Sequence, residues 1–167
     1  MTERTKKTPA QSRLSLHHLM LPEHANALGN VHGGMIMRWV DEAGAICAMR
    51  HAHAPCVTVA IDSMTFRQPV HVGELLSCSG IVTWVGKSSI EVEVHVHAEN
   101  AVTGELTHTN SAFLVYVAID SAGRPVSVPE LELTSDEERQ LFADGAERQR
   151  ARLARAAAGQ RSQHPPA

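Results

Sequence analysis

The chain has 167 residues, a length that suits a single domain. Hydrophobic residues make up 43% and charged residues 20%, which is close to the globular average and permits a real core. The formal net charge of -3 gives no general reason to expect a nucleic-acid partner, and no stretch approaches the ~18 uninterrupted apolar residues of a membrane span.

The N-terminal segment and the cysteines indicate a compartment. Residues 1–13 are polar, no apolar signal-peptide core follows them, and we expect them to form a disordered leader. Cys47, Cys56 and Cys78 are odd in number and form no CxxC pair, which favours free thiols in a reducing environment. Together these features predict a cytoplasmic protein without a membrane anchor.

The first elements along the chain are a short strand and a long helix. Residues 14–21 read as a strand that stops at Pro22, and a loop of turn and cap formers follows. From about Gly33 to Met49 the apolar residues recur at helical spacing. Such a helix is about 25 Å long, enough to cross a whole sheet.

The segment from Cys56 to Ile119 reads as a run of strands: VTVAIDSMTF, ELLSCSGIVTWV, SIEVEVHVHA and THTNSAFLVYVAI. In SIEVEVHVHA an apolar and a polar face alternate with a period of two: Ile90, Val92, Val94 and Val96 against Glu91, Glu93, His95 and His97. Breaks at Gly86-Lys87, 101–104 and 120–123 are typical of turns. One helix before a run of antiparallel strands favours an α+β fold with the sheet curled around the helix.

The composition shifts after Pro129, and residues 131–158 predict a C-terminal helix. Thr134 or Ser135 is the N-cap candidate, acidic residues occupy the first turn, and arginines gather toward the end, as the helix dipole prefers. The apolar stripe of this helix is thin, which predicts a peripheral position or packing on a neighbouring subunit. Residues 159–167 are expected to form a disordered tail.

Three separated motifs carry a resemblance to a known family. The segment MLPEHANALGNVHGGMIMRWVDEAGAICAMRH resembles the signature of the hotdog-fold acyl-CoA thioesterases, and so do the strand SMTFRQPVHVGE and the hairpin VGKSSIEVEV. The resemblance covers residues 14–130 in order. It implies a hotdog domain, in which an antiparallel sheet wraps one long central helix. It also implies dimers that form a continuous double sheet and assemble into hexamers as trimers of dimers.

The activity that the resemblance implies is hydrolysis of acyl-CoA to free fatty acid and CoA. Such a hydrolase must polarise the thioester carbonyl, and Gly33-Gly34 stand at the start of the long helix, where backbone N–H groups have no intrahelical partner. An N–H near Gly34 would donate to the thioester oxygen as negative charge develops. Taken alone, the pair is better explained as a glycine helix start without catalytic meaning, and the surrounding motif reverses this preference.

Asp41 is the candidate base or nucleophile. A carboxylate within an otherwise apolar helix is costly to bury unless it is paired or used. Asp41 lies seven positions from Gly34, roughly 10 Å along the axis, so a site that uses both is easier to build from two subunits. By resemblance, Asp41 aligns with the catalytic aspartate of the family and Asn26 with its catalytic asparagine, which orients the water or the thioester. The competing explanation is an ion pair with Arg38 or Arg50.

The CoA phosphates need cations and small hydrogen-bond donors. The candidates are Arg67 and the turn at Gly86, Lys87, Ser88 and Ser89, near which the resemblance places CoA, whereas a solvated hairpin tip is the plainer explanation. His32 and Gly33, beside the catalytic segment, are expected to shape the substrate site, and a simple loop role is the alternative for His32. No cofactor is expected beyond the CoA of the substrate.

Two other functions remain open. A hotdog hydratase or dehydratase would use a histidine with a carboxylate, and the loop before the helix offers His24 beside Asn26. A non-catalytic acyl-CoA binding module would bind CoA without turnover. The eleven histidines do not indicate a metal site, because no HExxH or CxxC motif accompanies any pair.

Overall fold

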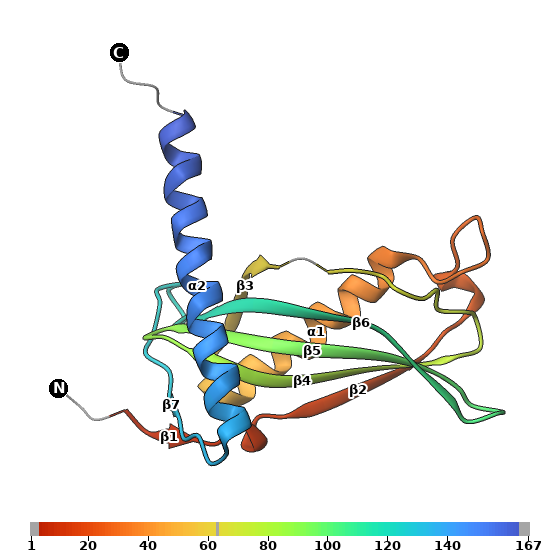
Figure 1. The fold of residues 1–167 in the computed structure, drawn as a ribbon, viewed down its shortest axis with the longest axis horizontal. Helices are drawn as coiled ribbons and strands as arrows, with labels where there is room; N and C mark the ends of the chain where they lie inside the picture. The colour runs from red at the N-terminus through yellow and green to blue at the C-terminus, as the bar shows by residue number, and fades with distance from the viewer. Residues whose placement is uncertain (1–3, 63, 164–167) are drawn as a thin grey trace.

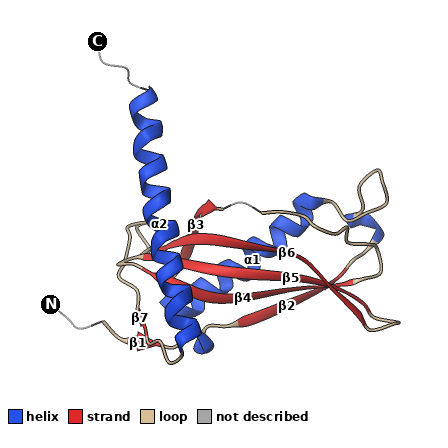
Figure 2. Ribbon diagram, viewed as in Figure 1, coloured by secondary structure: helices blue, strands red, loops and turns tan. Residues whose placement is uncertain are grey.

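The centre of the molecule is an antiparallel five-stranded sheet in the order β2-β4-β5-β6-β3. The computed structural model describes residues 4–62 and 64–163. The strands are β2 (Leu14–Leu19), β3 (Cys56–Ile61), β4 (Leu75–Val85), β5 (Ser89–Asn100) and β6 (Glu105–Ala118). Helix α1 (Gly33–Ala52) lies behind the sheet and helix α2 (Asp136–Gln163) crosses in front of it (Figures 1 and 2). The expected α+β architecture, with one long helix against an antiparallel sheet and a second helix after it, is confirmed.

The core lies between α1 and the sheet. The predicted alternation along β5 is confirmed, since the side chains of one face are fully buried: Ile90, Val92, Val94 and Val96. They belong to one hydrophobic cluster with Val40, Ala43 and Cys47 of α1. Burying a side chain of this size stabilises the fold by roughly 1.5–3 kcal/mol, so this layer fixes how α1 sits on the sheet.

The segment after β3 differs from the prediction of further strand. β3 ends at Ile61, and within residues 64–74 the described backbone has only an isolated bridge between His71 and Asn30. Pro69 has no N–H to give to a ladder, and Gly73 has a φ of +91°, which strands do not use. One anchor is the Arg67 N–H, which donates to the Thr109 carbonyl at 3.1 Å. Ser63, within the predicted strand, lies outside the described residues.

The structure also differs from the expected disordered leader at residues 4–13. Strand β1 (Lys6–Lys7) pairs in parallel with β7 (Glu130–Leu131), and the short helix η1 (Pro9–Gln11) follows. Because the partner strand is more than 120 residues away in sequence, local composition gives no sign of this pairing. Residues 1–3 lie outside the described part of the chain. A second short helix, η2 (Pro22–His24), precedes α1.

Helix α2 begins at Asp136 rather than 131, because Glu130 and Leu131 are used by β7. Ser135 caps it: its hydroxyl accepts the Glu138 N–H at 3.1 Å, while the Glu138 carboxylate accepts the Thr134 N–H at 2.6 Å. The helix backbone continues to Gln163, past the expected start of the tail, and residues 164–167 lie outside the described residues.

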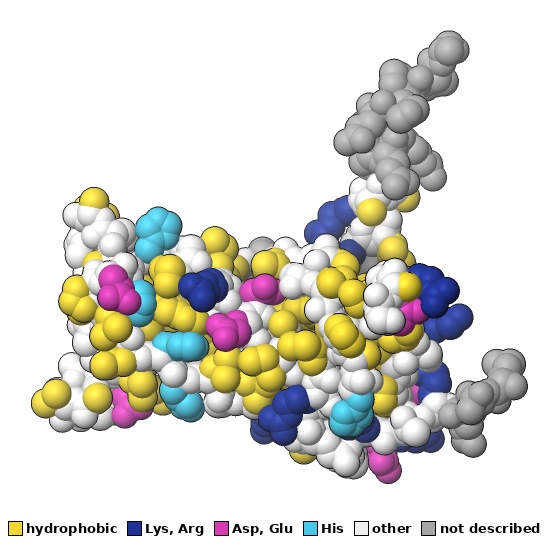
Figure 3. Space-filling view, turned by 180° about the vertical axis from the view of Figure 1, so that it is seen from behind, with side chains coloured by type: hydrophobic (Ala, Val, Ile, Leu, Met, Phe, Trp, Pro, Cys, Tyr) yellow, Lys and Arg dark blue, Asp and Glu magenta, His cyan; other side chains and the backbone are white. Residues whose placement is uncertain are grey.

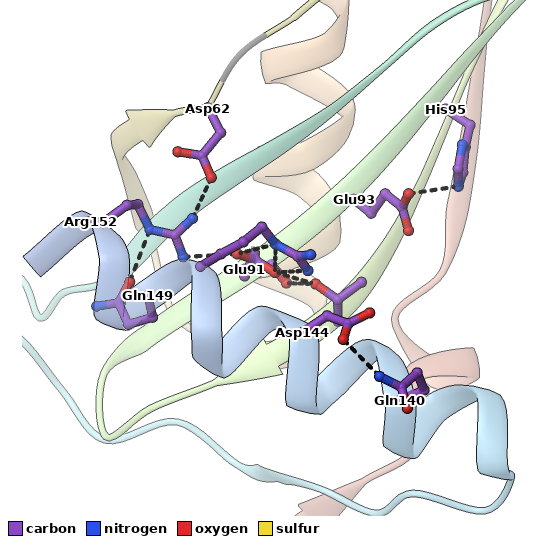
Figure 4. A network of polar contacts seen from close by, with 10 residues as sticks. Asp62, Glu91, Glu93, His95, Gln140, Asp144, Gln149 and Arg152 are labelled. Atoms are coloured by element: carbon purple, nitrogen blue, oxygen red, sulfur yellow. Dashed lines mark hydrogen bonds and ion pairs between the residues drawn. The ribbon is translucent and has the colours of Figure 1, made fainter.

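Helix α2 packs on the sheet of its own chain, whereas its thin apolar stripe predicted a peripheral position or packing on a neighbouring subunit. Gly145 lies so close to Trp84 that an added Cβ would stand 2.6 Å from the Trp84 Cβ. Beside this contact, Glu91 of β5 is fully buried under the helix (Figure 4). Arg148 reaches its Oε1 at 2.7 Å, and Arg152 reaches its Oε2 at 2.8 Å. Arg152 also binds Asp62, just beyond β3, at 2.6 Å. Buried charges thus join α2 to the sheet beside its apolar contacts.

Strand β3 is an edge strand with an apolar surface. One side of β3 pairs with β6, and no described strand pairs with its other side. Val57, Val59 and Ile61 are 43%, 55% and 48% exposed, and exposed apolar side chains also gather on the face seen from behind (Figure 3). An exposed apolar edge is a template for pairing with another strand.

No helix among residues 4–62 and 64–163 is long and apolar enough to cross a membrane.

The end of α1 is tied to both terminal segments through His51, which is fully buried. Its Nε2 lies 3.0 Å from the Pro129 carbonyl oxygen, which can only accept, so Nε2 carries the proton. Nδ1 is then the acceptor for the Ser12 hydroxyl at 3.3 Å. Burial lowers the pKa of His51, the Pro129 carbonyl opposes this, and the nearby charge of Lys7 lowers the pKa further.

This neutral histidine predicts acid-sensitive stability. The unfolded chain protonates His51 near its ordinary pKa of about 6.5, whereas the folded chain does so only at lower pH, so the contribution is complete above about 6.5 and is lost below it. We expect the thermal unfolding midpoint to fall between pH 7.5 and 5.5, and His51→Gln to flatten that slope. His71→Gln, at an exposed position, is the control. An unchanged slope in His51→Gln would contradict the assignment.

Candidate active site

The loop before α1 places Asn26 in the lining of a cavity. The Asn26 side-chain oxygen accepts the N–H groups of Leu28 and Asn30 at 2.8 and 3.3 Å, a turn typical of asparagine. Its oxygen is therefore occupied, and the amide nitrogen is the part left to donate to a ligand. The cavity, of about 340 Å³, is also lined by Gly33, Phe66 and Arg67. The structure thus brings together three of the predicted site residues, Asn26, Gly33 and Arg67.

The start of α1 supplies one N–H group that is free and one that is occupied. His32 is the N-cap residue, and its Nδ1 accepts the Gly34 N–H at 3.0 Å. A carbonyl oxygen could use this N–H only after the His32 ring moves aside. The Gly33 N–H has no acceptor among the residues that the structure describes. The donor expected near Gly34 is therefore immediately available only at Gly33, the residue that also lines the cavity.

Asp41 lies in the middle of α1, where two strands supply its partners. Thr58 of β3 donates its hydroxyl to Asp41 Oδ1 at 2.8 Å, and the Tyr116 hydroxyl of β6 lies 3.2 Å from the same oxygen. No described residue donates to Oδ2. The alternative ion pair is not formed, since no described contact joins Asp41 to Arg38 or Arg50. Asp41 is partly exposed and does not line the cavity of Asn26.

The turn from Gly86 to Ser89 lies at the other end of the sheet. The Val128 N–H donates to the Lys87 carbonyl at 2.9 Å, which places this turn beside the end of α1 rather than its start (Figure 1). Lys87 is exposed, and Ser88 and Ser89 are half-buried. Within one chain, the predicted CoA-binding residues Arg67 and Lys87 are therefore not brought together.

His24, which a hydratase would need as an acid or base, has a structural role here. Its Nδ1 accepts the Leu21 N–H at 3.1 Å, and its ring packs edge-on against Trp39 with centroids 5.0 Å apart. No described contact joins it to Asp41. This arrangement does not favour the hydratase reading. Among the residues that the structure describes, no group of three or more His, Cys, Asp or Glu side chains is placed to hold a metal ion.

Thr58 and Tyr116 are the residues near Asp41 that the sequence did not reveal. Both contacts depend on the pairing Thr58↔Tyr116 between β3 and β6, and no local pattern predicts such a pairing. One signal was present in the sequence: Gly44 follows Asp41 by three positions, on the same helix face, and so leaves room for a large neighbour.

Comparisons with known proteins agree on one family. The thioesterase superfamily model matches residues 28–105. The rat (Rattus norvegicus) cytosolic acyl coenzyme A thioester hydrolase is 34% identical over 140 residues, which cover 83% of this chain and 37% of that protein. The crystal structure of an apo-hexameric acyl-CoA thioesterase is 39% identical, with a TM-score of 0.87 over 92% of this chain and 98% of that one.

An acyl-CoA hydrolase from Staphylococcus aureus, solved with butyryl coenzyme A, coenzyme A and coenzyme A disulfide, is 29% identical, with a TM-score of 0.85 over 94% of this chain and 96% of that one. The same hydrolase has been solved as three alanine variants: of an asparagine, of an aspartate 15 residues later and of a threonine a further 17 residues on. With the fold and the family model in agreement, the chain belongs to the thioesterase superfamily and, within it, to the hotdog-fold acyl-CoA thioesterases.

Proposed function

We propose that this protein hydrolyses acyl-CoA thioesters, with Asp41 as general base or nucleophile. The observation that carries the proposal is the state of the Asp41 carboxylate, whose Oδ1 is held by two hydroxyl groups while Oδ2 receives no hydrogen bond from any described residue. An aspartate that is oriented at one oxygen and free at the other is suited to act on a ligand. Asn26, Asp41 and Thr58 also have the spacing of the three positions varied in the S. aureus hydrolase.

The reaction needs only groups of the chain and water. As general base, Asp41 Oδ2 takes a proton from water, whose oxygen attacks the thioester carbonyl carbon; the C–S bond then breaks, and the CoA thiolate leaves and is protonated. As nucleophile, Oδ2 attacks the carbonyl carbon itself, the C–S bond breaks and the CoA thiolate leaves and is protonated; water then hydrolyses the resulting anhydride and returns the Asp41 carboxylate. In both routes the Asn26 amide orients the water or the thioester. The Gly33 N–H stabilises the carbonyl oxygen as it becomes negative, and the Gly34 N–H can join it once the His32 ring moves aside. CoA enters only as part of the substrate.

The complete site is proposed to lie between two subunits. Asn26 and Gly33 line a cavity that Asp41 does not reach, and the apolar edge of β3 is suited to pair with the β3 of a second copy. If the two β3 strands pair antiparallel, opposite ends of the two sheets lie side by side. The Gly86–Ser89 turn of the partner then lies on the side of Arg67, so that the two subunits share the CoA phosphates. Three such dimers would form the hexamer that the apo thioesterase relative displays. We place the enzyme in the cytoplasm.

A mixing experiment tests the shared site. Asn26→Ala and Asp41→Asn variants, each inactive alone, are unfolded together, refolded and assayed for thiol release from acyl-CoA. In a heterodimer one site carries both substitutions and the other carries neither. Because random pairing makes half of the dimers mixed, we expect recovery of about a quarter of the wild-type rate.

The control for the mixing experiment is each variant refolded alone, which should stay inactive. If the mixture remained as inactive as its components although mass spectrometry showed mixed dimers, Asn26 and Asp41 would have to act within one chain. Thiol release by the wild-type protein, measured in parallel, tests the hydrolase activity itself.

A further inference from the structure

Tyr116 reaches Asp41 from beneath the helix. It is the one tyrosine of the chain, it lies on β6, and its side chain is fully buried. Its hydroxyl lies 3.1 Å from the Asp41 backbone carbonyl oxygen and 3.2 Å from Oδ1, so a single phenolic proton is shared between the two acceptors. This contact therefore fixes the side chain of Asp41 relative to its own backbone.

Gly44 provides the space for this hydroxyl. A Cβ added at Gly44 would collide with the Tyr116 oxygen and also stand 3.1 Å from the Tyr116 Cζ. Glycine in a helix interior costs roughly 1 kcal/mol relative to alanine. Its presence one turn after Asp41 is explained if the hydroxyl must come this close to the helix.

The two donors to Asp41 differ in their surroundings. Thr58 is on the exposed edge strand, whereas Tyr116 is held inside the core on all sides. Burial, together with the neighbouring Asp41, raises the pKa of Tyr116 far above its ordinary value, so the phenol remains a proton donor throughout the physiological range. Tyr116 is thus the rigid member of the pair.

We propose that Tyr116, whose hydroxyl packs against Gly44, is the positioning residue of the active site. It holds Asp41 Oδ1 and so presents Oδ2 as the reacting oxygen. The inference rests on the proposed role of Asp41. It deepens that role by naming which carboxylate oxygen reacts and which side chain determines this.

The variant Tyr116→Phe removes the hydroxyl and keeps the ring. We expect kcat for acyl-CoA hydrolysis to fall by about tenfold while KM changes less than about twofold, because the contact orients the base rather than the substrate. Thr83→Val is the matched control, since it removes another buried hydroxyl, bonded to Glu91 at 2.9 Å and away from Asp41. It should leave both kinetic constants unchanged.

A second measurement uses the unsubstituted chain. Because there is one tyrosine, growth on 3-fluorotyrosine labels Tyr116 alone. Its ¹⁹F resonance should differ between the wild type and the labelled Asp41→Asn variant, because the phenolic proton then meets an amide oxygen in place of a carboxylate oxygen. The same resonance in the two labelled proteins, or a Tyr116→Phe enzyme with the kcat and KM of an active wild type, would overturn the inference and leave the hydrolase proposal intact. A wild type that releases no thiol would overturn the hydrolase proposal itself.

Discussion

Asp41→Asn is expected to lower kcat for acyl-CoA hydrolysis by at least about a hundredfold. The amide can neither take a proton from water nor attack a thioester, and general-base catalysis typically contributes 10²–10⁴-fold. The asparagine oxygen can still accept from the Thr58 and Tyr116 hydroxyls, so the local structure has its partners and the fold should persist. The loss would therefore report on chemistry rather than on unfolding.

The measurement is release of free thiol from acyl-CoAs between acetyl and palmitoyl, with circular dichroism and the thermal midpoint of each variant. Glu42→Gln is the control, because it neutralises the adjacent, exposed carboxylate and should keep the wild-type rate. Full activity of Asp41→Asn would remove Asp41 from the mechanism even if the wild type proves to be a thioesterase. The panel of chain lengths would in addition define the acyl preference.

Of the substitutions proposed for this chain, Arg152→Ala is expected to destabilise the fold most, lowering the free energy of unfolding by about 3 kcal/mol. Arg152 is mostly buried and binds both Glu91 and Asp62, as Figure 4 shows. Removing one partner of a buried charge typically costs 3–5 kcal/mol, because the remaining charge is left in a medium that solvates it poorly. Arg148 still reaches Glu91 at 2.7 Å, which places the expected value at the lower end.

Urea unfolding followed by circular dichroism at fixed protein concentration would measure this difference. Arg155→Ala is the matched control: Arg155 is 72% exposed, lies 3.8 Å from Asp62, and should change stability by less than about 0.5 kcal/mol. Equal effects of the two substitutions would mean that the buried carboxylate is hydrated despite the helix above it. Combining Glu91→Gln with Arg152→Ala should cost clearly less than the sum of the two single changes.

The elements that the sequence predicted well are those with a local signature. The period of two in β5 places Ile90 and Val94 in the core, and the helical spacing from Gly33 onward identifies α1. The elements that were missed depend on distant partners. Strand β1 exists because Glu130 and Leu131 pair with it, and Glu91 is buried because α2 brings two arginines over it.

The candidate site shows the same division. Asn26, Gly33 and Asp41 could be proposed from the sequence because they lie within one continuous motif. The threonine and tyrosine that orient Asp41 come from two strands, 17 and 75 residues further along the chain. Their role follows from the register between β3 and β6, which turns both side chains toward the helix. Resemblance supplied the roles of the motif residues, and only the coordinates supplied their partners.

The burial of Glu91 has a consequence for synthesis of the chain on the ribosome. The last strand of the central sheet ends at Ala118, yet the cations that neutralise Glu91 are carried by residues 148 and 152. Until α2 emerges, the outer face of β5 must keep its water, because the carboxylate has no other described cation. Desolvation of this face therefore requires that residues 148 and 152 have already been synthesised. Helix α2 supplies both of these arginines, so the same segment covers the face and neutralises the Glu91 carboxylate.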